Sequence, residues 1–218
     1  MSKTRILVAD DHEIVRQGLR TVLEQGEDLE VCGEAANGRE AVNMAIELRP
    51  HIAVLDFGMP ELNGLEATRQ IRQALPDCEV LLLTMHDTEQ LVREVLAAGA
   101  RGFVLKNDAG RMLISAIEAL REHRPFFSSK VSEVLLSGFL NPQAVADELA
   151  AGRAGLTPRE REIVQLVAEG RSTKETADQL GISVKTAETH RANIMRKLNL
   201  GSVADLVRYA VRNGIIQP

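Results

Sequence analysis

Acidic, hydroxyl and basic side chains stand at the ends of four short apolar runs in the first half of this chain. Asp10 and Asp11 follow "RILVA", Asp56 ends "IAVLD", Thr84 ends "EVLLLT" and Lys106 ends "GFVLK". Carboxylates that converge repel one another, and a hard divalent cation with oxygen ligands neutralises them well. Mg2+ fits this set because it keeps some of its waters and shares phosphate oxygens. The set therefore predicts phosphoryl chemistry assisted by Mg2+.

Asp56 is the candidate nucleophile of this set. Its carboxylate could attack a phosphoryl group in line and form an aspartyl phosphate, while Lys106 and Thr84 hold the phosphoryl oxygens. Taken singly, each residue has a simpler explanation: the Asp10 and Asp11 pair could cap the next helix, and Lys106 could be a solvated cation. Joint placement at four strand ends is much less easily accidental.

Five β-rich apolar runs alternate with amphipathic segments before residue 122. The runs are "RILVAD" (5–10), "EVCGEA" (30–35), "IAVLDF" (52–57), "EVLLLTM" (79–85) and "GFVLK" (102–106). Nearly continuous apolar runs are typical of strands buried on both faces, and their regular alternation with helices predicts a doubly wound α/β fold with a five-stranded parallel sheet. In such a sheet the crevice for chemistry lies at the carboxyl ends of the strands, where the polar set falls.

Two further expectations concern packing in this half. In the segment "HEIVRQGLRTVLEQ", apolar residues at helical spacing should line one buried stripe: Ile14, Val15, Leu19, Val22 and Leu23. Cys32 and Cys78 lie far apart, with no Cys or His at metal-ligand spacing, so the sequence argues against a zinc site. Both are expected to be buried, reduced thiols.

The alternation stops in residues 124–155, which Pro, Ser, Asn and Gly interrupt. We interpret residues 122–151 as a partly helical linker rather than a sixth strand and helix. Its apolar residues Val134, Leu135, Leu136 and Phe139 are expected to pack on one of the two flanking domains.

Four short helices are predicted after residue 156. Thr157-Pro158-Arg159-Glu160 and Ser172-Thr173-Lys174-Glu175 are capping boxes, and Ser183 and Ser202 can cap two further helices. Between the second and third helices, Gly181-Ile182-Ser183 suits the turn of a helix-turn-helix. On the third helix, spacing places Ala187, Ile194 and Leu198 inside. Lys185, Glu188, Thr189 and Ala192 share the outer face, which would enter a major groove.

The net charge of −5 conceals a split along the chain. Residues 1–151 hold 15 Lys and Arg against 24 Asp and Glu, a net charge of −9, whereas residues 152–218 hold 11 against 7, a net charge of +4. This split indicates two units with different partners, and nucleic acid is a candidate for the second. With 3% aromatic residues and no Trp, binding of single strands by base stacking is disfavoured. Because no signal segment and no apolar run of ~18 residues occurs, the protein is expected to be cytoplasmic, with no membrane partner.

Residues 3 to about 121 resemble the receiver domain of two-component response regulators, on the segments "VADDHEIVRQGL", "LDFGMPELNGLE", "LLLTMH" and "GARGFVLK". The resemblance implies a flavodoxin-like fold and transfer of a phosphoryl group from a cognate sensor histidine kinase to Asp56. It implies that Mg2+ is held by Asp11, Asp56, the Gly58 carbonyl and, through water, Asp10.

By the same resemblance, Thr84 and Lys106 sense the phosphoryl group and Phe103 is the switch aromatic that turns inward. Phe103 has no hydroxyl, so the signal should be read through packing. Gly58 and His86 occupy the variable positions that tune dephosphorylation in this family, where His86 could position a water.

Residues 152–217 resemble the LuxR-type helix-turn-helix domain, on the segment "LTPREREIVQLVAEGRSTKETADQLGISVKTAETHRANIMRKL". Its pairing with a receiver resembles the NarL/FixJ class of transcriptional regulators. The resemblance implies that the recognition helix begins at Val184 and that the last helix, 202–213, contributes to dimerisation. Base-edge candidates are Lys185, Glu188, Thr189 and Ala192, while Thr186, His190, Arg191, Arg196 and Lys197 are expected to meet phosphates or support packing.

Two positions depart from the pattern of these relatives. Glu188 and Ala192 stand where relatives often carry basic or larger polar residues, so direct base readout is expected to be thin. Thr176 stands where the scaffold helix usually has an aliphatic residue, which should loosen the packing.

The expected organisation is a receiver domain at 3–121, a linker at 122–151 and a DNA-binding domain at 152–217. The expected function is a transcription regulator that binds double-stranded DNA in a sequence-specific manner, as a homodimer that forms on phosphorylation. The letters Asp56-Phe57-Gly58 also occur in protein kinases, but the chain has neither the Gly-rich loop nor the H-R-D segment that kinase chemistry needs. A turnover enzyme is therefore not expected, and the chemistry should be confined to Asp56 itself.

Overall fold

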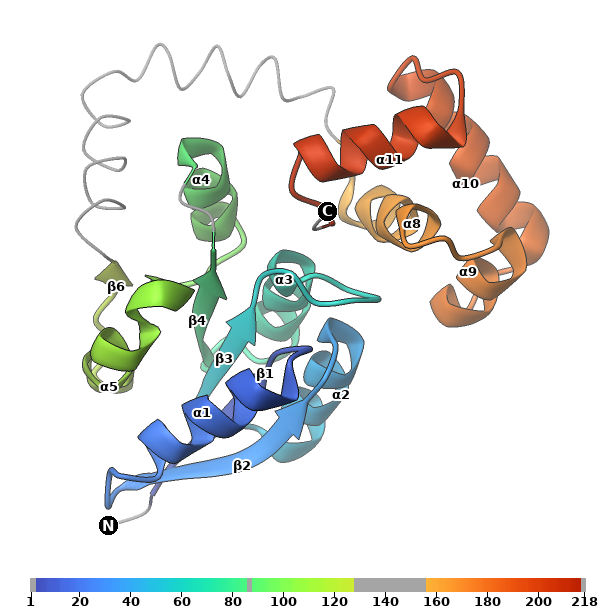
Figure 1. The fold of residues 1–218 in the computed structure, drawn as a ribbon. Helices are drawn as coiled ribbons and strands as arrows, with labels where there is room; N and C mark the ends of the chain where they lie inside the picture. Colours follow the sequence, from blue (N-terminus) through green and yellow to red (C-terminus); the bar gives the residue numbers. More distant parts are fainter. Residues whose placement is uncertain (1–2, 86–87, 128–155, 217–218) are drawn as a thin grey trace. The chain divides into compact units, whose positions relative to one another are not determined.

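Two compact units, Met1–Phe139 and Leu140–Pro218, make up the chain. The computed structural model describes residues 3–85, 88–127 and 156–216. Figure 1 shows strands and helices together in the first unit and only helices in the described part of the second. None of the helices within the described ranges is long and apolar enough to span a membrane.

A parallel sheet forms the centre of the first unit. Its strands are β1 (Thr4–Ala9), β2 (Leu29–Ala35), β3 (Ile52–Asp56), β4 (Glu79–Thr84), β5 (Gly102–Leu105) and β6 (Phe126–Phe127). The order across the sheet is β2-β1-β3-β4-β5-β6, and every neighbouring pair is parallel. The predicted α/β fold with a parallel sheet is confirmed.

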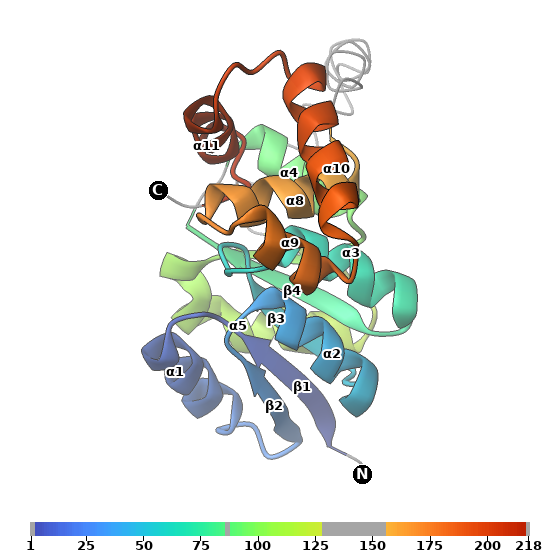
Figure 2. The same cartoon turned by 90° about the vertical axis from the view of Figure 1, so that its right-hand side faces the viewer.

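Helices cover both faces of this sheet, and each face has its own core (Figures 1 and 2). The core under α1 (Glu13–Leu23) and α5 (Lys106–Arg121) takes Ile6 and Val8 from β1, whereas Leu7 and Ala9 belong to the other core. That second core is covered by α2 (Gly38–Leu48), α3 (Gly64–Ala74) and α4 (Glu89–Ala97). Because alternate side chains enter opposite cores, the central strands read as continuous apolar runs.

The prediction of five strands was wrong by one. Phe126 and Phe127, inside the predicted linker, form β6 and pair in parallel with Gly102 and Phe103 of β5. A strand of two residues is too short to show an alternating pattern, so sequence periodicity cannot predict β6. The remaining linker, including Val134, Leu135, Leu136 and Phe139, lies outside the described residues.

The predicted apolar stripe of α1 was correct except for Ile14. Leu19 and Leu23 are buried, and Val15 and Val22 pack against the same core, but Ile14 is 85% exposed. At 3.6 residues per turn, Ile14 lies about 140° around the helix from Leu19, so it faces away from the sheet.

Both cysteines are free thiols, as expected. Cys78 is buried, and burial raises its pKa to about 12, which makes it an unreactive thiol at neutral pH. Cys32 is only half-buried on the edge strand β2, so the expectation of burial was right for Cys78 alone.

Four helices form the described part of the second unit: α8 (Pro158–Ala168), α9 (Thr173–Leu180), α10 (Val184–Lys197) and α11 (Val203–Arg212). Both predicted capping boxes are present, because Thr157 and Ser172 exchange reciprocal hydrogen bonds with Glu160 and Glu175. Ser183 and Ser202 cap α10 and α11 through their side chains. Since caps are local chemistry, the sequence predicts these starts well.

The turn between α9 and α10 has the expected helix-turn-helix form. Gly181 adopts a left-handed conformation with φ 64°, and the Ile182 amide donates to the Ala177 carbonyl at 3.0 Å. Ser183 then starts α10 at once. The predicted inner residues Ala187 and Ile194 are buried, and Leu198 packs against the helical core that contains Ile194.

Thr176 carries the unusual polar group of this core. Its side chain is 1% exposed, and its hydroxyl oxygen has no hydrogen-bond partner among the residues that the structure describes. A buried hydroxyl without a partner is destabilising because it has lost its water.

We expect Thr176→Val to stabilise the second unit by about 1 kcal/mol, because valine has the same shape without the hydroxyl. Chemical denaturation monitored by circular dichroism measures the change. Thr176→Ser is the matched control: it keeps the hydroxyl and removes a methyl group, so it should destabilise by about 1 kcal/mol. A valine variant no more stable than wild type would contradict the assignment.

Candidate functional site

The polar residues predicted at strand ends do meet at one edge of the sheet. Asp10 follows β1, Asp56 ends β3 and Thr84 ends β4, and all three side chains are buried. Lys106 begins α5 directly after β5. Because β1, β3, β4 and β5 are consecutive in the sheet, their carboxyl ends bring these residues together.

Lys106 is the cation at the centre of this site. Its ammonium lies 2.7 Å from Oδ2 of Asp10 and 2.9 Å from Oδ1 of Asp56. We describe both contacts as ion pairs. Neither carboxylate oxygen accepts a hydrogen bond of good geometry from a donor among the described residues. Two buried carboxylates thus face each other across one ammonium.

Burial and mutual repulsion set the protonation of this group. Burial raises the pKa of Asp56, the Asp10 charge raises it further, and Lys106 and a backbone hydrogen bond from Gly58 only partly oppose the rise. Burial tends to lower the pKa of Lys106, but its contacts with Asp10 and Asp56 outweigh that effect and the pKa is raised. Lys106 therefore stays charged at neutral pH, and Asp56 ionises less readily than an exposed aspartate.

The turn Asp10-Asp11-His12 forms the outer rim of the site. The His12 amide donates to Oδ1 of Asp10 at 2.9 Å, and the His12 imidazole lies 2.8 Å from Oδ1 of Asp11. Asp11 is more accessible than Asp10, with 33% of its side chain exposed against 0%. The sequence prediction does not include His12, although an imidazole beside two carboxylates is a recognisable signal.

The loop after Asp56 is fixed by the start of α3. The Gly64 amide donates to the Phe57 carbonyl at 2.9 Å, and a Cβ atom on Gly64 would lie 2.1 Å from the Asp56 carbonyl oxygen. Only glycine lets the helix approach the strand end so closely. Gly58, whose carbonyl was predicted to bind metal, is half-buried in this loop.

Thr84 and Phe103 lie on neighbouring strands. Thr84 is paired in register with Leu105 of β5, and Phe103 is paired with Leu82 of β4. Phe103 is 1% exposed and belongs to the core under α2, α3 and α4. Its ring is therefore turned inward in this structure. His86, predicted to influence dephosphorylation, lies outside the described residues.

The donor set of the site suits a hard divalent cation. Asp10, Asp11 and Asp56 offer carboxylate oxygens, and two of these oxygens are buried without hydrogen bonds from the described residues. Asp10, Asp11 and His12 also place one ligand atom each within 4.8 Å of one another. An acidic pocket of this composition fits Mg2+, which prefers few protein carboxylates and retains waters.

The second unit presents one polar face on α10. Lys185, Thr186, Glu188, Thr189, Arg191, Arg196 and Lys197 are exposed, and His190 is half-buried. The buried Ala187 and Ile194 lie on the opposite side. Helical spacing therefore correctly predicted which residues of α10 are exposed and which are buried.

Some basic side chains of this face already have partners. The Lys197 ammonium is 2.8 Å from Oε2 of Glu160, the capping-box residue of α8. Arg196 donates to Asn193 at 2.7 Å. Lys185, by contrast, has no ion pair within the described ranges, so its ammonium is the freer group to meet a base edge or phosphate.

A hollow of about 360 Å³ lies where the C-terminal half of α10 meets the start of α11. It is lined by Glu188, Arg191, Ala192, Met195, Gly201, Ser202 and Val203. The small Ala192 side chain leaves this space open beside Glu188. The sequence prediction does not include Gly201, Ser202 or Val203, because their proximity to α10 depends on how α11 folds back.

Comparison with known families matches both halves of the chain. Residues 6–118 match the response regulator receiver domain, and residues 154–210 match the bacterial regulatory proteins of the luxR family. The oxygen regulatory protein NreC of Staphylococcus epidermidis is 39% identical over 217 residues, covering 98% of this chain and 99% of that protein. The transcriptional regulatory protein LiaR of Bacillus subtilis is 38% identical over 212 residues, covering 97% and 99%.

A solved structure with a similar fold spans both halves of the chain. RcsB from Salmonella enterica serovar Typhimurium, bound to promoter rprA in the presence of the phosphomimetic BeF3−, is 29% identical. The comparison covers 95% of this chain and 98% of that one, with a TM-score of 0.61.

We expect Gly64→Ala to destabilise the first unit by about 1–3 kcal/mol, because the new methyl group collides with the Asp56 backbone. Thermal unfolding of the purified chain measures the loss. Gly18→Ala is the matched control, since nothing lies within 4 Å of a Cβ there and helix α1 should gain about 0.5–1 kcal/mol. Equal effects of the two substitutions would rule out the close approach.

We expect Asp56→Asn to stabilise the chain in EDTA at pH 7 by about 1–3 kcal/mol, because it removes a buried charge that faces Asp10. The folded pKa of Asp56 is raised, so its contribution to stability is present below its unfolded pKa and is lost as pH rises through the folded value. The advantage of Asn should therefore disappear in acid, where Asp56 is protonated in wild type too. Unfolding curves at several pH values test this, and an advantage independent of pH would contradict it.

Proposed function

The chain belongs to the two-component response regulators that join a receiver domain to a LuxR-type DNA-binding domain, and we propose that it is a transcription regulator switched by phosphorylation of Asp56. The observation that carries this proposal is the Lys106 ammonium between the buried carboxylates of Asp10 and Asp56. That pocket occurs in the same chain as a capped helix-turn-helix with an exposed polar face.

We propose that the receiver domain occupies residues 3–121, the linker 122–151 and the DNA-binding domain 152–217. The matched regions at 6–118 and 154–210 fall within the two proposed domains. The β6 strand at Phe126–Phe127 adds to the sheet from the linker side of the first boundary.

The proposed phosphoryl donor is a cognate sensor histidine kinase. The Asp56 carboxylate attacks the phosphorus in line, the new O–P bond forms as the P–N bond to the donor histidine breaks, and the leaving imidazole takes the electron pair. Asp11, Asp56, the Gly58 carbonyl and, through water, Asp10 would hold Mg2+, and the chemistry that it supplies is neutralisation of the phosphoryl oxygens. Lys106, already within 2.9 Å of Asp56, can turn its ammonium to the new phosphate.

Thr84 and Phe103 are proposed to convert this chemistry into a change of packing. Thr84 is buried at the end of β4, where its hydroxyl can donate to a phosphoryl oxygen on Asp56. Movement of Thr84 would alter the space beside β5, which carries Phe103. Because Phe103 has no hydroxyl, it can report the change only through packing in the core.

The proposed partner of the second domain is double-stranded DNA. Lys185 and Thr189 stand on the exposed face of α10 and could reach base edges, and Arg191 and Arg196 would meet phosphates. A homodimer formed on phosphorylation would bind two half-sites about one helical turn apart. The structure of the relative RcsB bound to promoter rprA in the presence of a phosphomimetic supports DNA as the partner of this domain.

The family is one of transcription regulators and not of turnover enzymes. We propose that phosphorylation and hydrolysis at Asp56 are chemistry on the protein's own side chain. Each phosphoryl group would then mark one regulator molecule for the lifetime of its aspartyl phosphate.

We expect a small phosphodonor to increase binding of the full chain to a subset of genomic DNA fragments in gel-shift assays, and Asp56→Asn to abolish the increase. Phosphorylation would favour the dimer, which doubles the number of phosphate contacts. Affinity should accordingly fall by on the order of 10³-fold or more between 50 and 200 mM salt if about six phosphates are contacted.

Two outcomes separate the parts of this proposal. No DNA binding under any condition would exclude the transcriptional function. Identical binding by wild type and Asp56→Asn, with donor present, would remove the switch and leave the DNA-binding function standing.

A further inference from the structure

The backbone of Asp10 is held from both sides by neighbouring elements. Its amide donates to the Ala35 carbonyl at the end of β2, at 3.2 Å, and its carbonyl accepts from Nη1 of Arg16, at 2.7 Å. Its carboxylate accepts from the His12 amide and pairs with Lys106. Asp10 therefore has little freedom to rotate, and only Arg16 among these partners binds the peptide group that joins Asp10 to Asp11.

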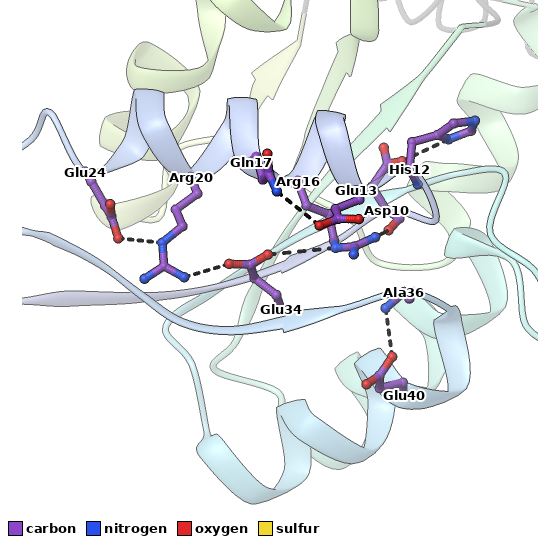
Figure 3. A network of polar contacts seen from close by, with 10 residues as sticks. All are labelled: Asp10, His12, Glu13, Arg16, Gln17, Arg20, Glu24, Glu34, Ala36 and Glu40. Carbon is purple, nitrogen blue, oxygen red and sulfur yellow. Dashed lines mark hydrogen bonds and ion pairs between the residues drawn. The ribbon is translucent and has the colours of Figure 1, made fainter.

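The direction of helix α1 explains how Arg16 reaches back to Asp10. Side chains on a helix lean toward its N-terminus, and Arg16 lies at the end of the first turn of α1, so its guanidinium points toward the strand end that precedes the helix. The side chain is only 16% exposed. Figure 3 shows it between α1 and the end of β1.

Glu34 of β2 anchors this guanidinium. Its Oε2 lies 3.8 Å from Nε of Arg16, and its Oε1 lies 2.7 Å from Nη1 of Arg20, one turn further along α1 (Figure 3). Two arginines at this spacing would repel each other, and the carboxylate between them removes that repulsion. Glu34 is followed directly by Ala35, whose carbonyl receives the Asp10 amide.

The contacts form a closed ring through Asp10, Arg16, Glu34 and Ala35. We propose that Arg16, anchored by Glu34, is a positioning residue of the phosphoryl-accepting site: it fixes the peptide plane after Asp10 and so aims the Asp10 and Asp11 carboxylates at the metal position. This inference rests on the proposed function of the pocket. Arg16 touches neither Asp56 nor the reacting atoms in the described contacts, so it acts through Asp10 and Asp11.

Removal of Arg16 should act on metal binding more than on the chemical step. Without the guanidinium, the Asp10 carbonyl loses the one side-chain donor that it has among the described residues. The following peptide can then rotate, which displaces Asp11 from the shared position. Partners that orient metal ligands typically contribute 10–100-fold to metal affinity. At saturating Mg2+ the ligands are pulled back into place, so the rate of phosphoryl transfer should recover.

The test compares Arg16→Met with Arg20→Met in the full chain. Methionine keeps an unbranched stem and removes the charge in both cases, and both arginines share Glu34, but only Arg16 reaches Asp10. Calorimetric titration with Mg2+ alone gives the dissociation constant, and a small phosphodonor gives the rate of Asp56 phosphorylation over a range of Mg2+ concentrations.

We expect Arg16→Met to raise the dissociation constant at least tenfold and to leave the rate at saturating Mg2+ within about threefold of wild type. Arg20→Met should change the dissociation constant less than twofold.

A dissociation constant unchanged in Arg16→Met, or raised equally in Arg20→Met, would overturn the inference while the proposed function stands. Wild type that neither binds Mg2+ nor becomes phosphorylated would overturn both. If Arg16→Met does not fold, Glu34→Gln takes its place, because it removes the anchor and leaves Arg16 intact. Its dissociation constant should rise at least threefold, and a value equal to wild type would overturn the inference.

Discussion

The repulsion between two buried carboxylates, Asp10 and Asp56, is the constraint around which the first unit is organised. Because β1 and β3 are neighbours in a parallel sheet, residues at their carboxyl ends cannot avoid each other. Burial makes the repulsion stronger, and a single ammonium from Lys106 cannot satisfy both groups fully. The site therefore stores electrostatic repulsion that a bound divalent cation would relieve. The glycine at position 64 and the ring through Arg16 keep the backbone from relaxing that repulsion by moving.

Strand ends were predictable from the sequence, and contacts between distant side chains were not. The apolar runs locate β1, β3, β4 and β5 because each is buried on both faces, and the polar residue after each run is then placed by topology alone. Arg16 and Glu34 have no such signal. Their contact depends on the distance between a helix and an edge strand, which only the packed structure fixes. The same limit explains β6, whose two residues pair only because α5 returns the chain to the sheet.

The second unit was predicted more completely because its determinants are local. Helix starts depend on a serine or threonine and the residue three positions later, and all four were read correctly. Spacing on α10 separated buried from exposed residues for the same reason. On α1, helical spacing wrongly predicted that Ile14 is buried. Ile14 lies next to the buried apolar stripe of this helix but faces solvent. The partner of Lys197 also required the structure, since Glu160 lies on another helix.

The short strand β6 has a consequence for how the chain leaves the sheet. Successive strand residues point to opposite faces, and Phe126 packs against the core under α1 and α5 while Phe127 packs against the core that contains Phe103. Detaching β6 from β5 breaks the hydrogen bonds between the two strands and also removes both phenyl rings from their cores. Release of β6 would therefore disturb both cores at once, and one of them is the core that contains Phe103.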